Sequence, residues 1–116
     1  MAEHNCLFCR IVAGEIPADI VHRDEQCIAF RDINPQSPVH VLIIPRKHIA
    51  SLHDTTPEDE ATLGHIMRVA AQVAGDEGIQ KSGYRTVINS GAGAGQSVFH
   101  LHAHVLGGRP FTWPPG

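Results

Sequence analysis

Residues 97–105 read Ser97-Val-Phe-His-Leu-His-Ala-His-Val105, and this stretch does most to decide the fold and the site. Side chains on a strand alternate between its two faces with a period of two residues. The pattern therefore predicts a strand over residues 98–106, with three histidines on one face and four apolar side chains on the other: His100, His102 and His104 against Phe99, Leu101, Ala103 and Val105. We expect the apolar face to join the core and the imidazoles to face a chemical site. Two alternatives stay open for the three histidines: they are structural metal ligands, or they lie on a solvent-exposed face by chance.

The rest of the sequence predicts the strands and helices that pack with this strand. We predict strands over residues 19–22, 26–31, 39–44 and 84–89 and a short helix over residues 6–13. A long helix is predicted to begin at Thr56-Pro57 and to end at Gly78, because these residue types favour helix starts and stops. The prediction is an α+β fold in one domain over residues 1–116, with an antiparallel sheet of about five strands, one long helix and a short N-terminal helix.

Composition excludes several classes of protein. The 116 residues carry a net charge of −3 and no basic run, which argues against binding a nucleic-acid backbone. The apolar run at residues 39–44 is far shorter than the about 20 residues that span a bilayer, and the N-terminus lacks signal-peptide features. Three cysteines, an odd number, favour a reducing compartment. We therefore expect a cytoplasmic protein without membrane or nucleic-acid partners.

The cysteines and histidines outside the last strand carry separate predictions. Cys6 and Cys9 have the spacing of zinc ligands, and free thiols packed in a small helix are the alternative. A thioredoxin-like motif is disfavoured because only five residues precede Cys6. Cys27, inside an apolar strand, is predicted to be a small buried hydrophobe. Four further histidines are predicted to be surface residues: His4, His22, His53 and His65.

A glycine loop stands immediately before the histidines. Gly91, Gly93 and Gly95 allow a close approach of the backbone to a ligand, and successive amides in such turns can form an anion-binding nest. Asn89, Gln96 and Ser97 add side-chain donors. The loop is not a P-loop, because no Gly-Lys-Ser/Thr follows. Beside three imidazoles, it suggests a site for a phosphate group.

The segment His100-Leu-His-Ala-His-Val resembles the His-x-His-x-His-x-x signature of the histidine triad (HIT) superfamily. The C-terminal Trp113-Pro-Pro-Gly is similar to the HINT branch, the histidine triad nucleotide-binding proteins and purine nucleoside phosphoramidases. The resemblance extends over nearly the whole chain, through Glu15-Ile-Pro-Ala, Ala29-Phe-Arg-Asp-Ile, Pro38-Val-His, Ile44-Pro-Arg-Lys-His, Gly95-Gln-Ser and Gly107-Gly-Arg.

The resemblance implies hydrolysis of purine nucleoside 5′-phosphoramidates through a covalent nucleotidyl-histidine on His102. The backbone carbonyl of His100 would orient the nucleophile, while His104 and the amides near Ser97 would hold the phosphate oxygens. Ser97 would pass a proton to the leaving amine. His40 would join a proton relay, although a hydrogen-bonded core histidine is the alternative for that position.

The same resemblance implies a nucleotide-binding set. Asp32 would accept from the ribose hydroxyls, and Ile33 would lie beside the base. Asn89 would contact the phosphate or the leaving group, and Gly95 and Gln96 belong to the phosphate loop. From the sequence alone, a loop-capping role for Asp32 is an equally good interpretation.

A structural zinc ion is implied as well, with Cys6, Cys9, His48 and His100 as ligands. Such an ion would remove His100 from proton transfer. The HINT branch often lacks these cysteines, so this chain mixes features of two branches.

The resemblance implies a homodimer, in which Trp113 reaches the neighbouring site or packs on its own chain. Two other functions stay open: a dinucleoside polyphosphate hydrolase, and a nucleotide-binding or interaction module with incidental turnover.

Overall fold

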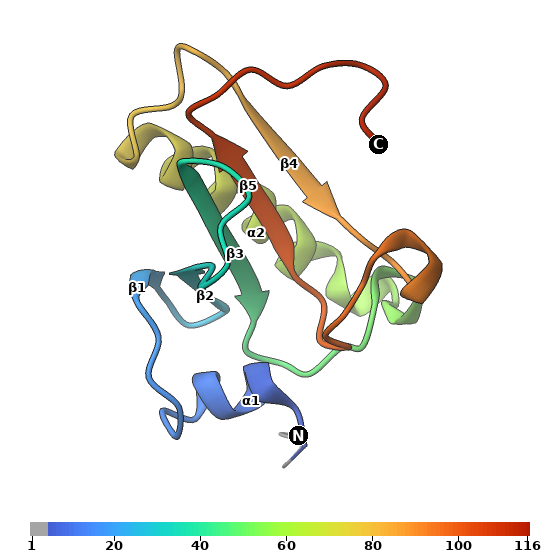
Figure 1. Cartoon of the computed structure of the whole chain (residues 1–116). Coiled ribbons are helices and arrows are strands. Elements are labelled where there is room, and N and C mark those ends of the chain that lie inside the picture. Colours follow the sequence, from blue (N-terminus) through green and yellow to red (C-terminus); the bar gives the residue numbers. More distant parts are fainter. Residues whose placement is uncertain (1–4) are drawn as a thin grey trace.

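The computed structural model describes residues 5–116, and its centre is a five-stranded antiparallel sheet with the order β1-β2-β3-β5-β4 (Figure 1). The strands are β1 Ile20–Arg23, β2 Cys27–Arg31, β3 Val39–Pro45, β4 Tyr84–Ile88 and β5 Ala103–Gly107. The helices are α1 Leu7–Val12 and α2 Glu60–Asp76, with the short 3-10 turns η1 Leu52–Asp54, η2 Pro57–Asp59 and η3 Ala92–Ala94. The predicted α+β class is confirmed.

Alternation along the central strand β3 divides the core into two layers. Val41 and Ile43 point to one face and pack with the buried side of α2. Leu42 and Ile44 point to the other face and pack with Phe8 and other residues of the N-terminal segment. The long helix α2 therefore covers one face of the sheet, and the short helix α1 covers only one end of the other (Figure 1). The uncovered part of that second face is where a site can open.

Helix α2 ends before Gly78 as predicted, but at the predicted start, Thr56-Pro57, the chain forms the 3-10 turn η2, and α2 itself begins at Glu60. The Asp59 carboxylate accepts a hydrogen bond of 2.9 Å from the amide of Thr56, which stabilises the turn η2 ahead of the helix. Gly78 adopts a φ of +76° just beyond the helix, a conformation that side chains with a Cβ disfavour. Within residues 5–116, no helix is both long enough and apolar enough to cross a membrane.

The last strand is shorter than predicted. It begins at Ala103, and residues 98–102 leave the sheet instead of extending it. The Nε2–H of His100 donates to the carbonyl of Pro45 (2.8 Å), and the amide of Leu101 donates to the carbonyl of Ile49 (2.7 Å). Because these contacts tie the segment to the end of β3 and to the chain that follows it, the backbone turns away from its expected register.

One predicted core residue of this stretch is wrong. Phe99 is 51% exposed, whereas Leu101 is 1% exposed and packs in the α2 layer. The period-two pattern holds from residue 101 onward, where odd-numbered side chains fill the core. It fails at Phe99 because that residue precedes the point at which the backbone rejoins the sheet.

Candidate active site

His102 lies at the end of the irregular segment, with its ring fixed by its own neighbour in the chain. The Nδ1–H of His102 donates to the backbone carbonyl of His100 at 2.8 Å, and the residue is 6% exposed. A carbonyl oxygen only accepts hydrogen bonds, so the proton of the neutral ring must be on Nδ1. Nε2 therefore keeps its lone pair, and this nitrogen is available as a nucleophile.

A second pair of imidazoles extends the site along the sheet. The amide of Gln36 donates to Nδ1 of His40 at 3.0 Å, which leaves the proton of a neutral His40 on Nε2. That Nε2 lies 2.9 Å from Nδ1 of His104. His40 thus donates to His104, and the proton of His104 is on Nε2. The ring centroids of His102 and His104 are 5.0 Å apart, so the chain of hydrogen bonds sets the N–H donor of the imidazole next to His102.

Burial keeps these rings neutral. Loss of hydration, together with the neighbouring rings of His102 and His40, lowers the pKa of His104 to about 4, although the Asp32 carboxylate opposes the shift. Burial also lowers the pKa of His40, although the Asp32 carboxylate opposes the shift. His104 is therefore a neutral donor near pH 7.

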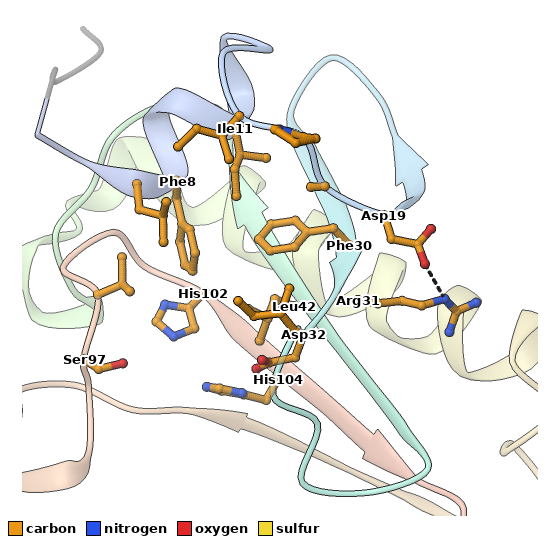
Figure 2. A pocket seen from close by; sticks show the side chains of 16 residues that line it. Phe8, Ile11, Asp19, Phe30, Arg31, Asp32, Leu42, Ser97, His102 and His104 are labelled. Carbon is orange, nitrogen blue, oxygen red and sulfur yellow. Dashed lines mark ion pairs between the residues drawn. The ribbon is translucent and has the colours of Figure 1, made fainter.

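A pocket of about 530 Å³ opens in front of His102 and His104, a volume typical of small-molecule sites. Phe8, Ile11 and Phe30 form an apolar wall, with the rings of Phe8 and Phe30 packed edge to face at 5.5 Å. Ser97, His102, His104 and Asp32 form one polar group of the lining, and the ion pair of Asp19 and Arg31 lines a separate edge (Figure 2). The pocket can accept a ligand with one flat apolar part and one charged part.

Asp32 and Ile33 line this pocket, as predicted for a nucleotide site. The Oδ1 atom of Asp32 accepts from the amide of Asn34 at 2.9 Å, which also supports the loop-capping interpretation. Its Oδ2 atom lies 3.5 Å from Nε2 of His40. Ile33 is fully exposed at the mouth of the pocket. The two roles of Asp32 are compatible, because they use different oxygens.

The glycine loop differs from the predicted anion nest. The amides of Ala94, Gly95 and Gln96 all donate to carbonyls within the loop, to Gly91 or Ala92, so they do not point at a ligand. The side chain of Gln96 is 4% exposed and donates to the carbonyls of Ala50 and Val98, and it accepts from the amide of Gly91. Gln96 therefore holds the loop in place, which corrects its predicted use as a donor to phosphate.

Two loop residues have separate positions. Ser97 lines the pocket with an exposed side chain and faces the imidazoles (Figure 2). Asn89 follows β4 and lies beside the loop, where its Nδ2 is 3.9 Å from the Cβ position of Gly95, and it is not among the residues that line the pocket. Gly95 takes a φ of +95°, which explains the glycine at that position.

The predicted zinc ligands come together at the N-terminus of α1. Cys6, Cys9, His48 and His100 each offer one donor atom, and these atoms lie within 4.8 Å of one another. Sγ of Cys9 is 3.2 Å from Nδ1 of His48 and 3.5 Å from Nδ1 of His100, and Sγ of Cys6 is 3.3 Å from the latter. Ligand atoms on a tetrahedral zinc ion are about 3.5 Å apart for a sulfur and nitrogen pair. The donor set therefore fits the ion.

The orientation of His100 supports the same fit. Its Nε2–H donates to the carbonyl of Pro45, so Nδ1 carries the lone pair and points at the thiols. Burial lowers the pKa of His100 to about 4 and raises the pKa of Cys6. Both ring nitrogens of His100 are engaged away from His102, so His100 contacts the His102 imidazole through its backbone carbonyl.

Sequence reasoning missed two features. The first is the apolar wall, because Phe8 and Ile11 are ordinary helix residues whose contact with β2 and β3 is nonlocal; Phe8 packs edge to face on His102 with ring centroids 5.1 Å apart. The signal was the period of apolar residues along α1, which places Phe8 and Ile11 on one face.

The second missed feature involves histidines that were predicted to be surface residues. His53 is exposed as predicted, and His4 lies outside the described residues. His22 and His65 are only partly exposed, and both hydrogen bond Oδ2 of Asp24, at 2.7 and 2.6 Å. Cys27 is fully buried, as predicted, and burial together with the Asp24 carboxylate raises its pKa to about 12.

Comparisons with known proteins find matches over nearly the whole chain. A family model described as HIT domain matches residues 13–111. An uncharacterized HIT-like protein of Synechocystis is 57% identical over 116 residues, which cover 100% of both chains. A HIT family hydrolase from Legionella pneumophila has the same fold with a TM-score of 0.94; it is 53% identical, and the match covers 97% of this chain and 100% of that chain. A zinc-bound histidine triad family protein from Mycobacterium smegmatis is 34% identical, with a TM-score of 0.79, over 97% of this chain and 80% of that chain.

Proposed function

This chain belongs to the HIT domain family, and from that membership we propose that it is a hydrolase that cleaves the P–N bond of purine nucleoside 5′-phosphoramidates. The observation that carries the proposal is the bare Nε2 lone pair of His102, which its Nδ1–H bond to the His100 carbonyl leaves facing a pocket. A neutral imidazole is both a good nucleophile and a good leaving group, so it can split one difficult displacement into two easier ones.

In the first half-reaction, Nε2 of His102 attacks the α-phosphorus of the substrate. A bond from this nitrogen to phosphorus forms as the phosphorus–amine bond breaks, and the departing amine takes a proton from the hydroxyl of Ser97. In the second half-reaction, water attacks the phosphorus and the bond to His102 breaks. The products are a nucleoside monophosphate and the amine, and a proton from the water restores Ser97.

His104 and His40 stabilise the phosphate during both displacements. The non-bridging oxygens gain charge in transfer, and a donor that is already oriented stabilises that charge without reorganising. The Nε2–H of His104 is such a donor, because its Nδ1 accepts from His40 and its tautomer is thereby set. His40 is thus a positioning residue that acts through His104.

The remainder of the nucleotide fits the rest of the pocket. A purine would lie against the apolar wall at Phe8 and Phe30, and Ile33 would cover it from the mouth. The Oδ2 atom of Asp32 is available to accept from the ribose hydroxyls, since Oδ1 is already bonded to the Asn34 amide. We assign Asn89 to the leaving-group side of the loop, beside Gly95.

Zinc has a structural part in this proposal. Cys6, Cys9, His48 and His100 would hold one ion, which supplies no open coordination position and so no reaction chemistry. The ion would fix α1 against the segments at residues 46–50 and 98–102. Because His100 supplies the carbonyl that orients His102, the ion would stabilise the catalytic geometry through the backbone.

A homodimer is part of the same proposal. Trp113 is 82% exposed in the C-terminal tail. A hydrogen bond of 2.8 Å, donated by the guanidinium of Arg85 on β4 to the carbonyl of Thr112, connects this tail to the sheet. A large exposed aromatic on a short tail is suited to contact a second copy.

The experiment that tests the activity compares two substrates. Steady-state kcat/KM is measured for adenosine phosphoramidate and for diadenosine tetraphosphate with the full chain. Faster turnover of the phosphoramidate supports the proposal, and faster turnover of the tetraphosphate would establish the rival hydrolase instead. Tight AMP binding with turnover of neither substrate would show a binding module.

A further inference from the structure

A second cluster of side chains of the types that can bind a metal ion lies on the opposite face of the sheet from His102. It consists of His22 on β1, Asp24 in the turn between β1 and β2, Cys27 on β2 and His65 on α2, and we call these four residues the Asp24 cluster. One donor atom from each residue lies within 4.8 Å of every other. Cys27 packs in the α2 layer of the core, whereas the active site opens on the α1 side.

Asp24 is oriented by its own turn so that one oxygen faces the other three residues. Its Oδ1 atom accepts from the amides of Gln26 (2.8 Å) and Cys27 (2.9 Å). Its Oδ2 atom lies 2.7 Å from Nε2 of His22, 2.6 Å from Nε2 of His65 and 3.6 Å from Sγ of Cys27. A carboxylate held by amides through one oxygen, with the other aimed at two imidazoles and a thiol, is the arrangement of a metal ligand supported from behind.

The distances suit a zinc ion after a small adjustment. Zinc bonds of about 2.0 Å to oxygen and nitrogen and about 2.3 Å to sulfur place tetrahedral ligands about 3.3 Å (oxygen to nitrogen) and about 3.5 Å (oxygen to sulfur) apart. The separation of Asp24 from Cys27 already matches. The imidazoles of His22 and His65 would move away from Asp24 by about 0.6 to 0.7 Å, which exchanges their hydrogen bonds with Asp24 for bonds to the ion.

The surroundings allow an ion to enter. The side chains of His22, Asp24 and His65 are 19%, 27% and 33% exposed, and a surface hollow lined by His22, His65 and Arg68 borders the cluster. Cys27 closes the site from the core side, where it is fully buried. Nitrogen, oxygen and sulfur donors together favour zinc over the hard cations magnesium and calcium, which take oxygen ligands.

We propose that the Asp24 cluster is a second zinc site, with Nε2 of His22, Oδ2 of Asp24, Sγ of Cys27 and Nε2 of His65 as ligands. On binding, each imidazole carries its proton on Nδ1, and the Cys27 thiol releases its proton to solvent, so one proton leaves per ion. The ion cross-links the β1–β2 turn to α2. The site stands independently of the proposed hydrolysis, because it lies on the other face of the sheet.

The test is the zinc stoichiometry of the full chain. Protein stripped with a chelator is titrated with Zn²⁺ in competition with a chromophoric chelator. The expected result is two equivalents per chain for the wild type and one for His22→Gln. His53→Gln removes an exposed histidine outside both clusters and is expected to keep two. Cys9→Ser is expected to lose the other equivalent and keep the one at the Asp24 cluster.

Equal zinc stoichiometry in the wild type and His22→Gln would overturn the proposal. This comparison decides the question even where Cys9→Ser fails to fold. A second readout uses Co²⁺ in place of Zn²⁺: the wild-type spectrum minus that of His22→Gln is expected to contain a thiolate-to-cobalt band from Cys27. A difference spectrum without that band would exclude Cys27 as a ligand and contradict the four-ligand site. Neither readout depends on hydrolytic activity.

Discussion

The neutral state of His104 makes the stability of the fold depend on pH in a way that one substitution removes. Burial lowers the pKa of the folded ring from its ordinary 6.5 to about 4. Below pH 6.5 the unfolded chain therefore binds a proton that the folded chain does not, and the free energy of unfolding falls as the pH falls. The loss is complete once the pH is below the folded value. Substitution by glutamine keeps a polar side chain of similar reach and removes the titration.

The size of the effect follows from the shift. About 2.5 pKa units at about 1.36 kcal/mol each amount to about 3 kcal/mol between pH 6.5 and pH 4. The ring is partly exposed, so solvent screening reduces this to about 2 kcal/mol. Near pH 5, one proton of difference gives a slope of at most about 1.4 kcal/mol per pH unit. The wild type is therefore expected to lose about 2 kcal/mol more than His104→Gln on going from pH 7 to pH 4.

The assay is urea unfolding at half-unit steps of pH, with chelator in every buffer so that metal release does not contribute. His53→Gln, which removes an exposed histidine outside the site, is the matched control and is expected to follow the wild type. Parallel curves for the wild type and His104→Gln between pH 6.5 and pH 4 would refute the reasoning, because the proton uptake would then not belong to His104.

Three further substitutions test other parts of the account. Ser97→Ala is expected to slow amides with poor leaving groups far more than those with good ones, as a general acid contributes about 10² to 10⁴-fold; equal losses in kcat/KM across a series of leaving groups would exclude the acid role. Gln96→Ala removes the partner of the Ala50 and Val98 carbonyls and of the Gly91 amide, and is expected to cost about 2 to 3 kcal/mol of unfolding free energy; the exposed Gln72→Ala is the control, and an equal stability of the two variants would contradict the bracing role. Phe8→Ala is expected to cost about 3 to 5 kcal/mol and to weaken AMP binding, because Phe8 is 5% exposed and packs on both Phe30 and His102; unchanged AMP affinity, measured by calorimetry, would remove Phe8 from the site.

Local patterns predicted the elements well where the contacts that fix them are local. The apolar run at residues 39–44 and the Gly78 stop signal are properties of neighbouring residues, and the structure confirms a strand at the first and a helix end at the second. The Thr56 signal marks the turn η2, which precedes α2. The last strand was predicted five residues too early, because His100 bonds Pro45, which is 55 positions away in the chain. A repeating pattern of residue types reports on near neighbours in the chain, so it does not predict a contact between residues this far apart.

The candidate site also has a part that the sequence predicts and a part that depends on contacts between distant residues. The resemblance placed His102, His104, Asp32 and Ser97, and the structure brings all four to one pocket. The composition of the glycine loop predicts an anion nest, yet the amides of Ala94, Gly95 and Gln96 donate to carbonyls of the loop itself. His22 and His65 were interpreted as separate surface residues, since only the turn at Asp24 and the packing of α2 on the sheet bring them together.

The central claim is that His102 becomes covalently bonded to the nucleotide, and trapping that adduct tests it most directly. Wild-type protein is mixed with adenosine phosphoramidate, quenched in alkali within the first turnover, digested and analysed by mass spectrometry. The account predicts one nucleotidyl group on the peptide around residues 99–105, at His102, and neither adduct nor turnover in His102→Ala that still binds AMP. An adduct on another residue, or phosphoramidate hydrolysis by His102→Ala at the wild-type rate, would contradict it.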